Sequence, residues 1–472
     1  MNWQIALPEL CLGGAGLAIL MVGVFAPRGR AYLTCTGLTL GALVATLYLV
    51  LTTPSGTGLS HLFVADAYSR FMQTLVLAGS LLALVLSLDF NPAVAIDRFE
   101  FPVLVLFATL GMLVMVSAGN CISLYLGLEL QSLGIYVLAA FARDDRRSVE
   151  AGLKYFVLGA LASGLLLYGI SLVYGFTGSM NFAHIRDALV ATPAPGLVIG
   201  IVFMIAGLAF KLSAAPFHMW TPDVYEGAPT SVTALLATAP KVAAIALLLR
   251  VLVGPFGHQL ESWQQIVILV SVVSMLWGAF AALGQTNIKR LMAYSSIGHM
   301  GYALIGLATG TQAGIRGVMI YMATYVAMSA GSFAVIIAMR RNHRPVERIA
   351  DLTGLGRTDP ALALVLTTLM FSMAGIPPMA GFFGKLYVFL AAVQAGLWAL
   401  AVIGVLTSVI GAYYYIRIIK VMYFDVGGEA LDRRPVALTT VAFATAAFTV
   451  FFVIVSHPII AAAQAASRAL LN

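Results

Sequence analysis

Four residues of this 472-residue chain combine an ionisable side chain with an unusual position. Lys211, Lys241 and Lys385 fall well inside long apolar runs, whereas nearly all of the arginines lie between such runs or at their ends. One acid, Glu129, is placed in the same way as the three lysines. A charge at the centre of a bilayer costs roughly 2.5–3.5 kcal/mol, so each position needs compensation by pairing, water or function.

Lysine rather than arginine at these depths indicates proton chemistry. A buried lysine can release its proton, whereas arginine stays charged. Glu129 near Lys211 would stabilise the protonated ammonium, and a proton moving elsewhere in the row would shift that pair. The pattern therefore predicts a relay that passes protons across an apolar core. The alternative for Glu129 and Lys211 is a static ion pair that holds two helices together.

Other polar residues are weaker candidates for the same chemistry. Lys154 lies nearer the end of its apolar run. It could take part in the relay, or its side chain could simply extend to the membrane surface, and the two alternatives are equally supported. His299 could carry protons between the two halves of the chain or could be a hydrogen-bonded packing histidine. Lys289 and Lys420 are expected to set topology or to extend to the membrane surface.

Three residues follow the apolar run that ends near Lys211, in the sequence PFHMWTPDVYEGAPTS. His218, Asp223 and Glu226 are expected at or near the cytoplasmic mouth of the pathway. They could admit protons there, although helix capping and loop structure would explain them equally well.

The elements that must hold these residues are membrane helices. The chain is 61% hydrophobic and 10% charged, with a mean hydropathy of +0.97, so it has too little polar surface for a soluble protein. Its successive apolar runs of about 20 residues are each long enough to cross a bilayer as a helix. We expect an all-α polytopic membrane protein with about fourteen transmembrane helices. They are expected near residues 4–26, 32–52, 67–88, 101–118, 120–141, 150–175, 196–215, 230–253, 263–283, 287–309, 314–340, 360–395, 397–424 and 436–457.

Two of these helices should be broken beside a lysine. The seventh ends in KLSAAPFHMW, and the twelfth contains MAGIPPMAGFFGK, where proline removes a backbone donor and disrupts the preceding turn. If helices four to eight correspond to helices nine to thirteen, the chain contains two inverted five-helix repeats. The expected parts are residues 1–100, a first repeat at 101–253, a second repeat at 254–424, and a C-terminal helix at 425–472.

The basic residues predict the orientation. Alternate connections are rich in arginine, and by the positive-inside rule these connections face the cytoplasm. Both termini should then face the periplasm of a bacterial inner membrane, or the equivalent side of an organelle membrane. The polar segment 181–191 is expected to form a short interfacial helix on the periplasmic side.

The ordered motifs KLSAAPFHMWTPDVYEGAPTSVTALLATAPKVAA, IKRLMAYSSIGHMGY and AGIPPMAGFFGKLYVF resemble the antiporter-like membrane subunits of respiratory complex I. The resemblance runs from helix four to helix thirteen and implies a proton-translocating subunit of the NADH-quinone oxidoreductase. The residues that match the functional positions of that family are Glu129, Lys154, Lys211, Lys241, His299 and Lys385. Lysine at 385 and the APKVAA sequence around Lys241 favour one branch of the family over its sisters.

The resemblance also implies what lies outside the chain. It implies that FMN, iron–sulfur clusters and quinone belong to partner subunits. This sequence itself has no glycine-rich dinucleotide turn and no cysteine cluster. We therefore expect no cofactor or metal site here, although the whole complex is an enzyme, a translocase. The expected partners are the other membrane and peripheral subunits, the lipid bilayer and protons, and not nucleic acid.

Two other functions remain open at this point. A subunit of a multisubunit cation/proton antiporter would share the fold and the lysine row but would use a sodium gradient. A structural membrane scaffold would use the same charges only to hold helices together.

Overall fold

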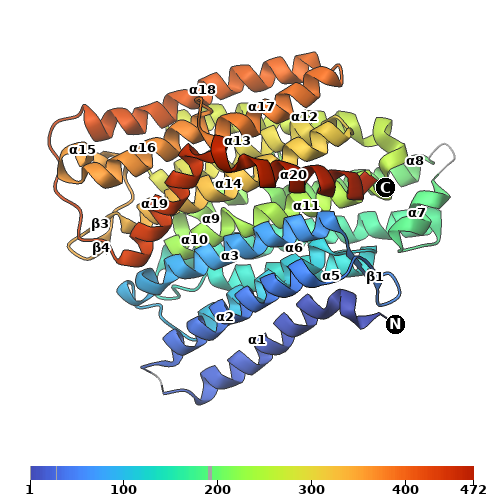
Figure 1. The fold of residues 1–472 in the computed structure, drawn as a ribbon, viewed down its shortest axis with the longest axis horizontal. Coiled ribbons are helices and arrows are strands. Elements are labelled where there is room, and N and C mark those ends of the chain that lie inside the picture. The colour runs from blue at the N-terminus through green and yellow to red at the C-terminus, as the bar shows by residue number, and fades with distance from the viewer. Residues whose placement is uncertain (1, 28, 190–193, 472) are drawn as a thin grey trace.

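Long helices lying side by side make up the protein in the computed structural model, which describes residues 2–27, 29–189 and 194–471. In Figure 1 the N- and C-termini lie at the same end of the bundle, together with the short helix α7. The arginine-containing hairpin of β3 and β4 lies at the opposite end. We call that opposite end the arginine-rich end.

The N-terminal half begins with one short 3₁₀ helix and continues as eleven α-helices across its described residues. These elements are η1 (Trp3–Ala6), α1 (Leu7–Phe25), α2 (Ala31–Thr52), α3 (Ala67–Ala93), α4 (Glu100–Val116), α5 (Cys121–Ala139), α6 (Arg146–Thr177), α7 (Phe182–Ala188), α8 (Pro195–Leu212), α9 (Trp220–Gly227), α10 (Thr230–Leu236) and α11 (Ala239–Val253).

The C-terminal half has the same character. Its helices are η2 (Gly257–Gln259), α12 (Leu260–Leu283), α13 (Ile288–Ala308), α14 (Gln312–Ala338), η3 (Ile349–Leu352), α15 (Leu355–Thr358), α16 (Pro360–Ala374), α17 (Ala380–Gln394), α18 (Trp398–Tyr423), α19 (Val436–Val450) and α20 (Phe452–Leu471). Two antiparallel hairpins pair β1 (Gly56–Gly58) with β2 (Phe63–Ala65) and β3 (Arg340–Arg341) with β4 (Arg344–Pro345).

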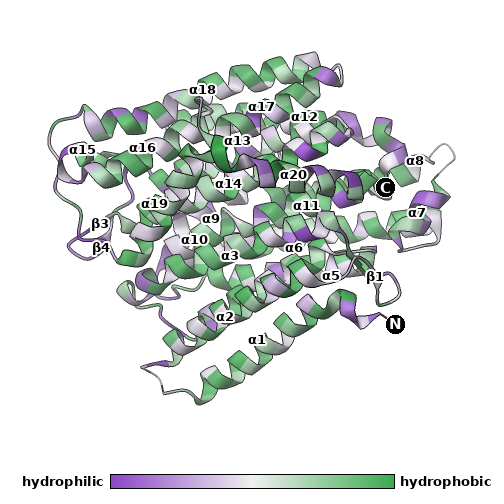
Figure 2. Ribbon diagram, viewed as in Figure 1, coloured by the Kyte–Doolittle hydropathy of each residue, from purple (hydrophilic) through white to green (hydrophobic). Residues whose placement is uncertain are grey.

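These helices suit a bilayer in length and in surface. Within the described ranges, 11 helices are long and apolar enough to cross a membrane, and α4, α16, α17 and α19 are shorter apolar helices. Figure 2 shows hydrophobic colour along most of the bundle, with hydrophilic residues gathered largely at its two ends. Large apolar side chains such as Leu161, Val409 and Ile454 are exposed on the outer helices, where lipid would cover them. The chain is therefore a multi-pass membrane protein.

Each expected span is found as a helix or as a pair of helices. The breaks predicted in the seventh and twelfth spans are confirmed as the interruptions between α8 and α9 and between α16 and α17. The predicted interfacial segment forms α7, although residues 190 and 191 fall outside the described part of the chain.

Two predictions about helix continuity were wrong. The eighth span, expected to be continuous over residues 230–253, is interrupted at Ala237 and Thr238 between α10 and α11. Pro240 explains the new start, because it lacks an amide donor and is well accommodated in the first turn of α11. The last span, expected to end at residue 457, is instead α19 followed by α20, which continues to Leu471.

The most deeply buried helices are α10, α11 and α14. Every residue of the apolar window in α10 and α11 is buried, and so are almost all of those in α14. Helix α11 packs against α3, α4 and α8, and α14 packs against α13, α17 and α19. The interior of the bundle therefore brings the breaks of both halves next to fully buried helices.

Candidate functional site

Lys241 lies on the first turn of α11 and is 1% exposed. Its Nζ donates to the carbonyl of Leu212 at 3.1 Å and to the hydroxyl of Ser213. It also lies 5.1 Å from the ring centre of Trp220. Leu212 is the last residue of α8, so its carbonyl has no partner within the helix and belongs to the negative end of the helix dipole. The break in α8 thus provides an acceptor for an ammonium group.

Lys385 lies on α17 and is 5% exposed. Its Nζ donates to the carbonyls of Met373 at 3.0 Å and Ala374 at 3.1 Å, and to Ser408 Oγ at 2.8 Å. The ammonium lies 4.8 Å from the ring centre of Tyr302. The two carbonyls end α16, so Lys385 also contacts the C-terminus of the first part of a broken helix.

Gly375 makes this contact possible. It follows Ala374 with φ +87°, a left-handed conformation that glycine adopts without strain. A Cβ at this position would come within 3.0 Å of Lys385 Cδ and 3.3 Å of its Nζ. A residue with a side chain would therefore be strained and would also displace the lysine.

Lys211 lies in the last turn of α8 and is buried. Its Nζ donates to Ser132 Oγ at 2.7 Å and to the Tyr136 hydroxyl at 2.8 Å, both on α5. The ammonium also lies 5.1 Å from the ring centre of Tyr136. Neutral hydroxyl groups thus stabilise the ammonium of Lys211.

Glu129 is not in direct contact with Lys211, which differs from the predicted pair. Within the described residues no ion pair joins the two, and Glu129 Oε1 is buried without a hydrogen-bond partner. Glu129 nevertheless lies one helical turn before Ser132 on α5, so both side chains belong to the same face.

His299 lies on α13 and is buried. Its Nδ1 is 2.6 Å from the Tyr321 hydroxyl and its Nε2 is 3.1 Å from the Tyr415 hydroxyl. The ring centres of His299 and Tyr302 are 6.2 Å apart, and the Tyr302 ring also contacts the ammonium of Lys385. The histidine therefore belongs to a cluster of hydroxyl groups next to Lys385.

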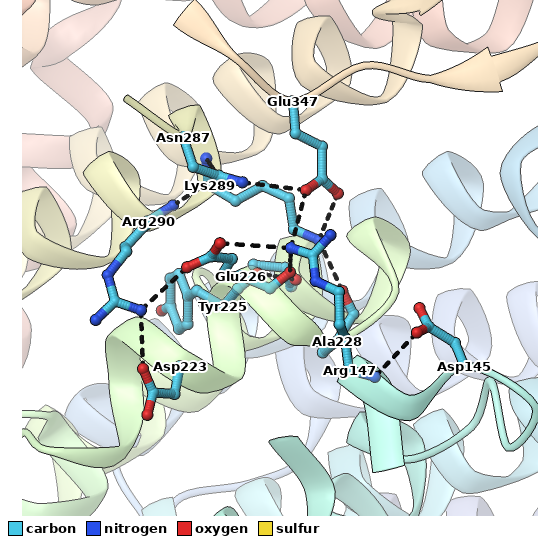
Figure 3. A network of polar contacts seen from close by, with 11 residues as sticks. Asp145, Arg147, Asp223, Tyr225, Glu226, Ala228, Asn287, Lys289, Arg290 and Glu347 are labelled. Carbon is cyan, nitrogen blue, oxygen red and sulfur yellow. Dashed lines mark hydrogen bonds and ion pairs between the residues drawn. The ribbon is translucent and has the colours of Figure 1, made fainter. Parts of the chain in front are cut away.

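The candidates near the arginine-rich end belong to a network of charges, of which Figure 3 shows Asp223 and Glu226 with Arg290. Lys154 Nζ lies 2.8 Å from both Glu150 and Asp223. Arg290 lies 2.8 Å from Asp223 and 3.0 Å from Glu226, so it joins two of the predicted residues. A cavity of about 210 Å³ is lined by this group.

His218 stands apart from that network. Its ring packs against Trp277 with centres 5.4 Å apart, and its Nδ1 has no hydrogen-bond partner in the described chain. The structure therefore brings Asp223 and Glu226 together but does not place His218 with them.

Sequence reasoning missed two buried ion pairs. Lys289, expected to set topology or extend outward, is 2% exposed and lies 3.0 Å from Glu347. Burial raises the pKa of Glu347, but Lys289 and Asn287 outweigh this effect and hold that pKa below its usual range. Arg250 pairs with Asp66 at 3.1 Å. The available signal was weak, because all of these residues lie near helix ends.

Two further features complete the interior. Glu9, near the start of α1, is buried and accepts from Gln73 at 2.8 Å and from Ser117 at 2.9 Å.

No group of three or more histidine, cysteine, aspartate or glutamate residues in the described ranges is placed to hold a metal ion. The tyrosines around the lysines gave no signal in the sequence, because tyrosine is common in membrane helices.

Broken helices whose free carbonyls meet buried lysines define an antiporter-like membrane subunit. Residues 118–411 match the family described as NADH:quinone oxidoreductase/Mrp antiporter, TM. The chain is 63% identical over 478 residues to NADH-quinone oxidoreductase subunit N of Granulibacter bethesdensis, with 100% of both proteins covered. It therefore belongs to the NADH-quinone oxidoreductase subunit N family, as the motifs predicted.

Solved structures agree with this assignment. A chain of respiratory complex I from Thermus thermophilus with bound aureothin is 33% identical, with a TM-score of 0.84, covering 97% of this chain and 99% of that one. A chain of the Mrp complex from Dietzia sp. DQ12-45-1b has a TM-score of 0.87 at 24% identity, covering 100% of this chain and 98% of that one. The second likeness shows a shared fold.

Proposed function

We propose that this chain is a proton-translocating membrane subunit of respiratory complex I, in which other subunits carry electrons from NADH to quinone. The observation that carries the proposal is the set of partners around Lys211, Lys241 and Lys385. Each ammonium is hydrogen-bonded to hydroxyls or backbone carbonyls, and among the described residues none contacts a carboxylate.

Neutral partners make proton release chemically reasonable. If a buried ammonium in a tight ion pair loses its proton, it leaves an uncompensated carboxylate in an apolar medium, which is costly. If Lys241 loses its proton, it leaves only a carbonyl and a hydroxyl, which need no countercharge. These sites can therefore alternate between charged and neutral lysine.

Glu129 and the outer residues complete the proposed relay. Glu129 acts on Lys211 through space rather than by direct contact. Lys154, Asp223 and Glu226 connect the interior to the arginine-rich end, and His299 connects to Lys385 through tyrosine hydroxyls. His218 is half-buried beside the break between α8 and α9, and we assign it no role in the relay.

The family also suggests the setting of the subunit. We place it in a bacterial inner membrane with the other membrane and peripheral subunits, where FMN, iron–sulfur clusters and quinone reside. The arginine-rich end would face the cytoplasm and both termini the periplasm. Reporter fusions after Arg348 and at the C-terminus test this orientation, and the same compartment for both would contradict it.

Lys241 provides the sharpest test of the relay. Lys241→Ala removes the titratable group, and Lys241→Arg keeps the charge but holds its proton, so a relay requires both variants to impair pumping. Each variant complex would be purified, checked for full subunit content, and assayed for NADH oxidation by quinone and proton uptake into vesicles. We expect a loss of at least about tenfold in proton uptake for both.

The same experiment separates the other functions. Near-normal pumping by Lys241→Arg would show that charge alone matters and would overturn the relay at this residue. A structural scaffold predicts incomplete assembly instead of impaired pumping. A cation/proton antiporter predicts sodium-dependent uptake that continues without NADH.

A further inference from the structure

The ion pair of Lys289 and Glu347 lies at the arginine-rich end, where Lys289 also contacts the first half of the chain (Figure 3). Lys289 is the second residue of α13, and its Nζ donates to the Ala228 carbonyl at 2.8 Å as well as to Glu347 Oε1 at 3.0 Å. Ala228 caps α9, which belongs to the first half. The lysine thus connects a helix end of one half with a carboxylate of the other.

The position of Glu347 is fixed by several contacts. Its Oε2 accepts from Asn287 Nδ2 at 3.1 Å and lies 3.4 Å from Arg147 Nη2. Its backbone carbonyl accepts from the amide of Ile288 at 2.8 Å. The segment that carries Glu347 is therefore bound to the start of α13, and this is not a loose surface ion pair.

A cavity of about 190 Å³ reaches this pair. Its lining includes both members of the pair together with Arg147, Glu226 and Pro229. Since one water molecule occupies about 30 Å³ in the liquid, this space can hold several. Glu347 is partly exposed, whereas Lys289 is buried. One member of the pair is therefore accessible to water and the other faces the interior.

The pair is also close to the interior row. Tyr225, one turn before Ala228 on α9, has a buried hydroxyl without a hydrogen-bond partner in the described chain, and its ring centre lies 5.9 Å from Lys241 Nζ. On α13, Ser296 lies two turns beyond Lys289 on the same face and contacts the Tyr325 hydroxyl at 2.8 Å. Buried hydroxyls are therefore present on α9 and α13, the two helices that bear contacts of the pair and also approach residues of the proposed relay.

We propose that Lys289 and Glu347 form an additional proton-transfer pair that exchanges protons between this water-accessible cavity and the interior row. The ammonium of Lys289 gives a proton to the carboxylate of Glu347, which leaves an amine and a carboxylic acid. The acid then releases the proton to water, and Arg147 and the cavity compensate the carboxylate that remains. The amine takes another proton from the interior. The same steps run in reverse for uptake. This inference rests on the proposed proton translocation.

The test uses two variants that preserve polar contacts. Lys289→Arg keeps the positive charge next to Glu347 but holds its proton, and Glu347→Gln keeps an acceptor for Lys289 but cannot carry a proton. We expect both assembled complexes to show a several-fold loss of proton uptake per NADH oxidised. Lys420→Arg is the matched control, because Lys420 pairs with Asp425 at an exposed position and should pump normally.

The outcomes distinguish this inference from the function on which it rests. Normal pumping by Lys289→Arg would show that the ion pair only holds the two halves together and would overturn the inference. If Lys289→Arg does not assemble, normal pumping by an assembled Glu347→Gln complex overturns it equally. Normal pumping by Lys241→Arg would instead contradict the relay itself.

Discussion

Lys241 and Lys385 occupy similar sites in the two halves, but they reach these sites from different elements. Each ammonium contacts the last carbonyls of the first part of a broken helix, a serine hydroxyl and an aromatic ring. Lys241 extends from the following helix, α11, whereas Lys385 extends back from α17, the second part of the same broken helix. The shared requirement is a free helix C-terminus, and the position of the lysine along the chain can vary.

The residue at the break differs accordingly. In the first half Ser213 adopts the left-handed conformation with φ +66° and also provides a hydroxyl to Lys241. In the second half these roles are divided, because Gly375 adopts the left-handed conformation and Ser408 on α18 provides the hydroxyl. The absence of a side chain at Gly375 gives the lysine stem its space.

The halves also differ in the partner of the broken helix. Helices α5 and α13 both begin at an asparagine cap, Asn120 and Asn287. Counting from these caps, Glu129 corresponds to Ser296, and Ser132 corresponds to His299. At these positions the first half therefore has a carboxylate and a serine, and the second half has a serine and a histidine. This correspondence supports the proposed repeats and shows that the two halves differ in charge at matching positions.

Among the changes that test this comparison, Gly375→Ala is expected to have the largest effect. A left-handed alanine costs roughly 1–2 kcal/mol, and its Cβ would also displace Lys385 from the end of α16. We expect the variant complex to lose most of its proton uptake, measured in vesicles during NADH oxidation.

Ser213→Gly in the first half is the matched control. Glycine keeps the left-handed conformation there, and Lys241 loses one hydroxyl but retains the Leu212 carbonyl. The loss of proton uptake should therefore be clearly smaller than for Gly375→Ala. Equal losses, or normal pumping by Gly375→Ala, would remove the proposed distinction between the two breaks.

A smaller effect is expected for Glu129→Gln. Because Glu129 does not touch Lys211, its charge acts at a distance and its loss should lower proton uptake only a few-fold while electron transfer in the other subunits continues. Ser296→Ala removes a hydroxyl rather than a charge at the corresponding position of the second half, so its effect on uptake should be smaller than that of Glu129→Gln. Uptake in Glu129→Gln that matched the unaltered complex would exclude a role for this carboxylate.

The sequence predicted the helices well because membrane helices follow a simple physical rule of length and hydrophobicity. The breaks at KLSAAPF and GIPP were predictable from proline and glycine. The interruption before Pro240 was missed because proline is also compatible with the first turn of a continuing segment, and hydropathy does not change there.

The site was predicted less completely than the fold. The depth of Lys211, Lys241 and Lys385 identified them as unusual, but their partners are serines, tyrosines and backbone carbonyls, which no single-sequence signal identifies. Lys289 was misjudged because its distance from water depends on Glu347, which reaches it from a connection 58 residues later in the chain. Contacts between such distant segments depend on tertiary packing, which local sequence patterns do not encode.

The contacts of Lys241 and Lys385 have a consequence for how the protein is synthesised and inserted. In both halves the carbonyl acceptors precede the lysine in the chain: Leu212 comes before Lys241, and Met373 and Ala374 come before Lys385. Because a ribosome makes the chain from its N-terminus, the helix end that accepts each ammonium leaves the ribosome before that ammonium does. The order of translation thus allows each lysine to find its partner as it enters lipid, where an unpaired charge would oppose insertion.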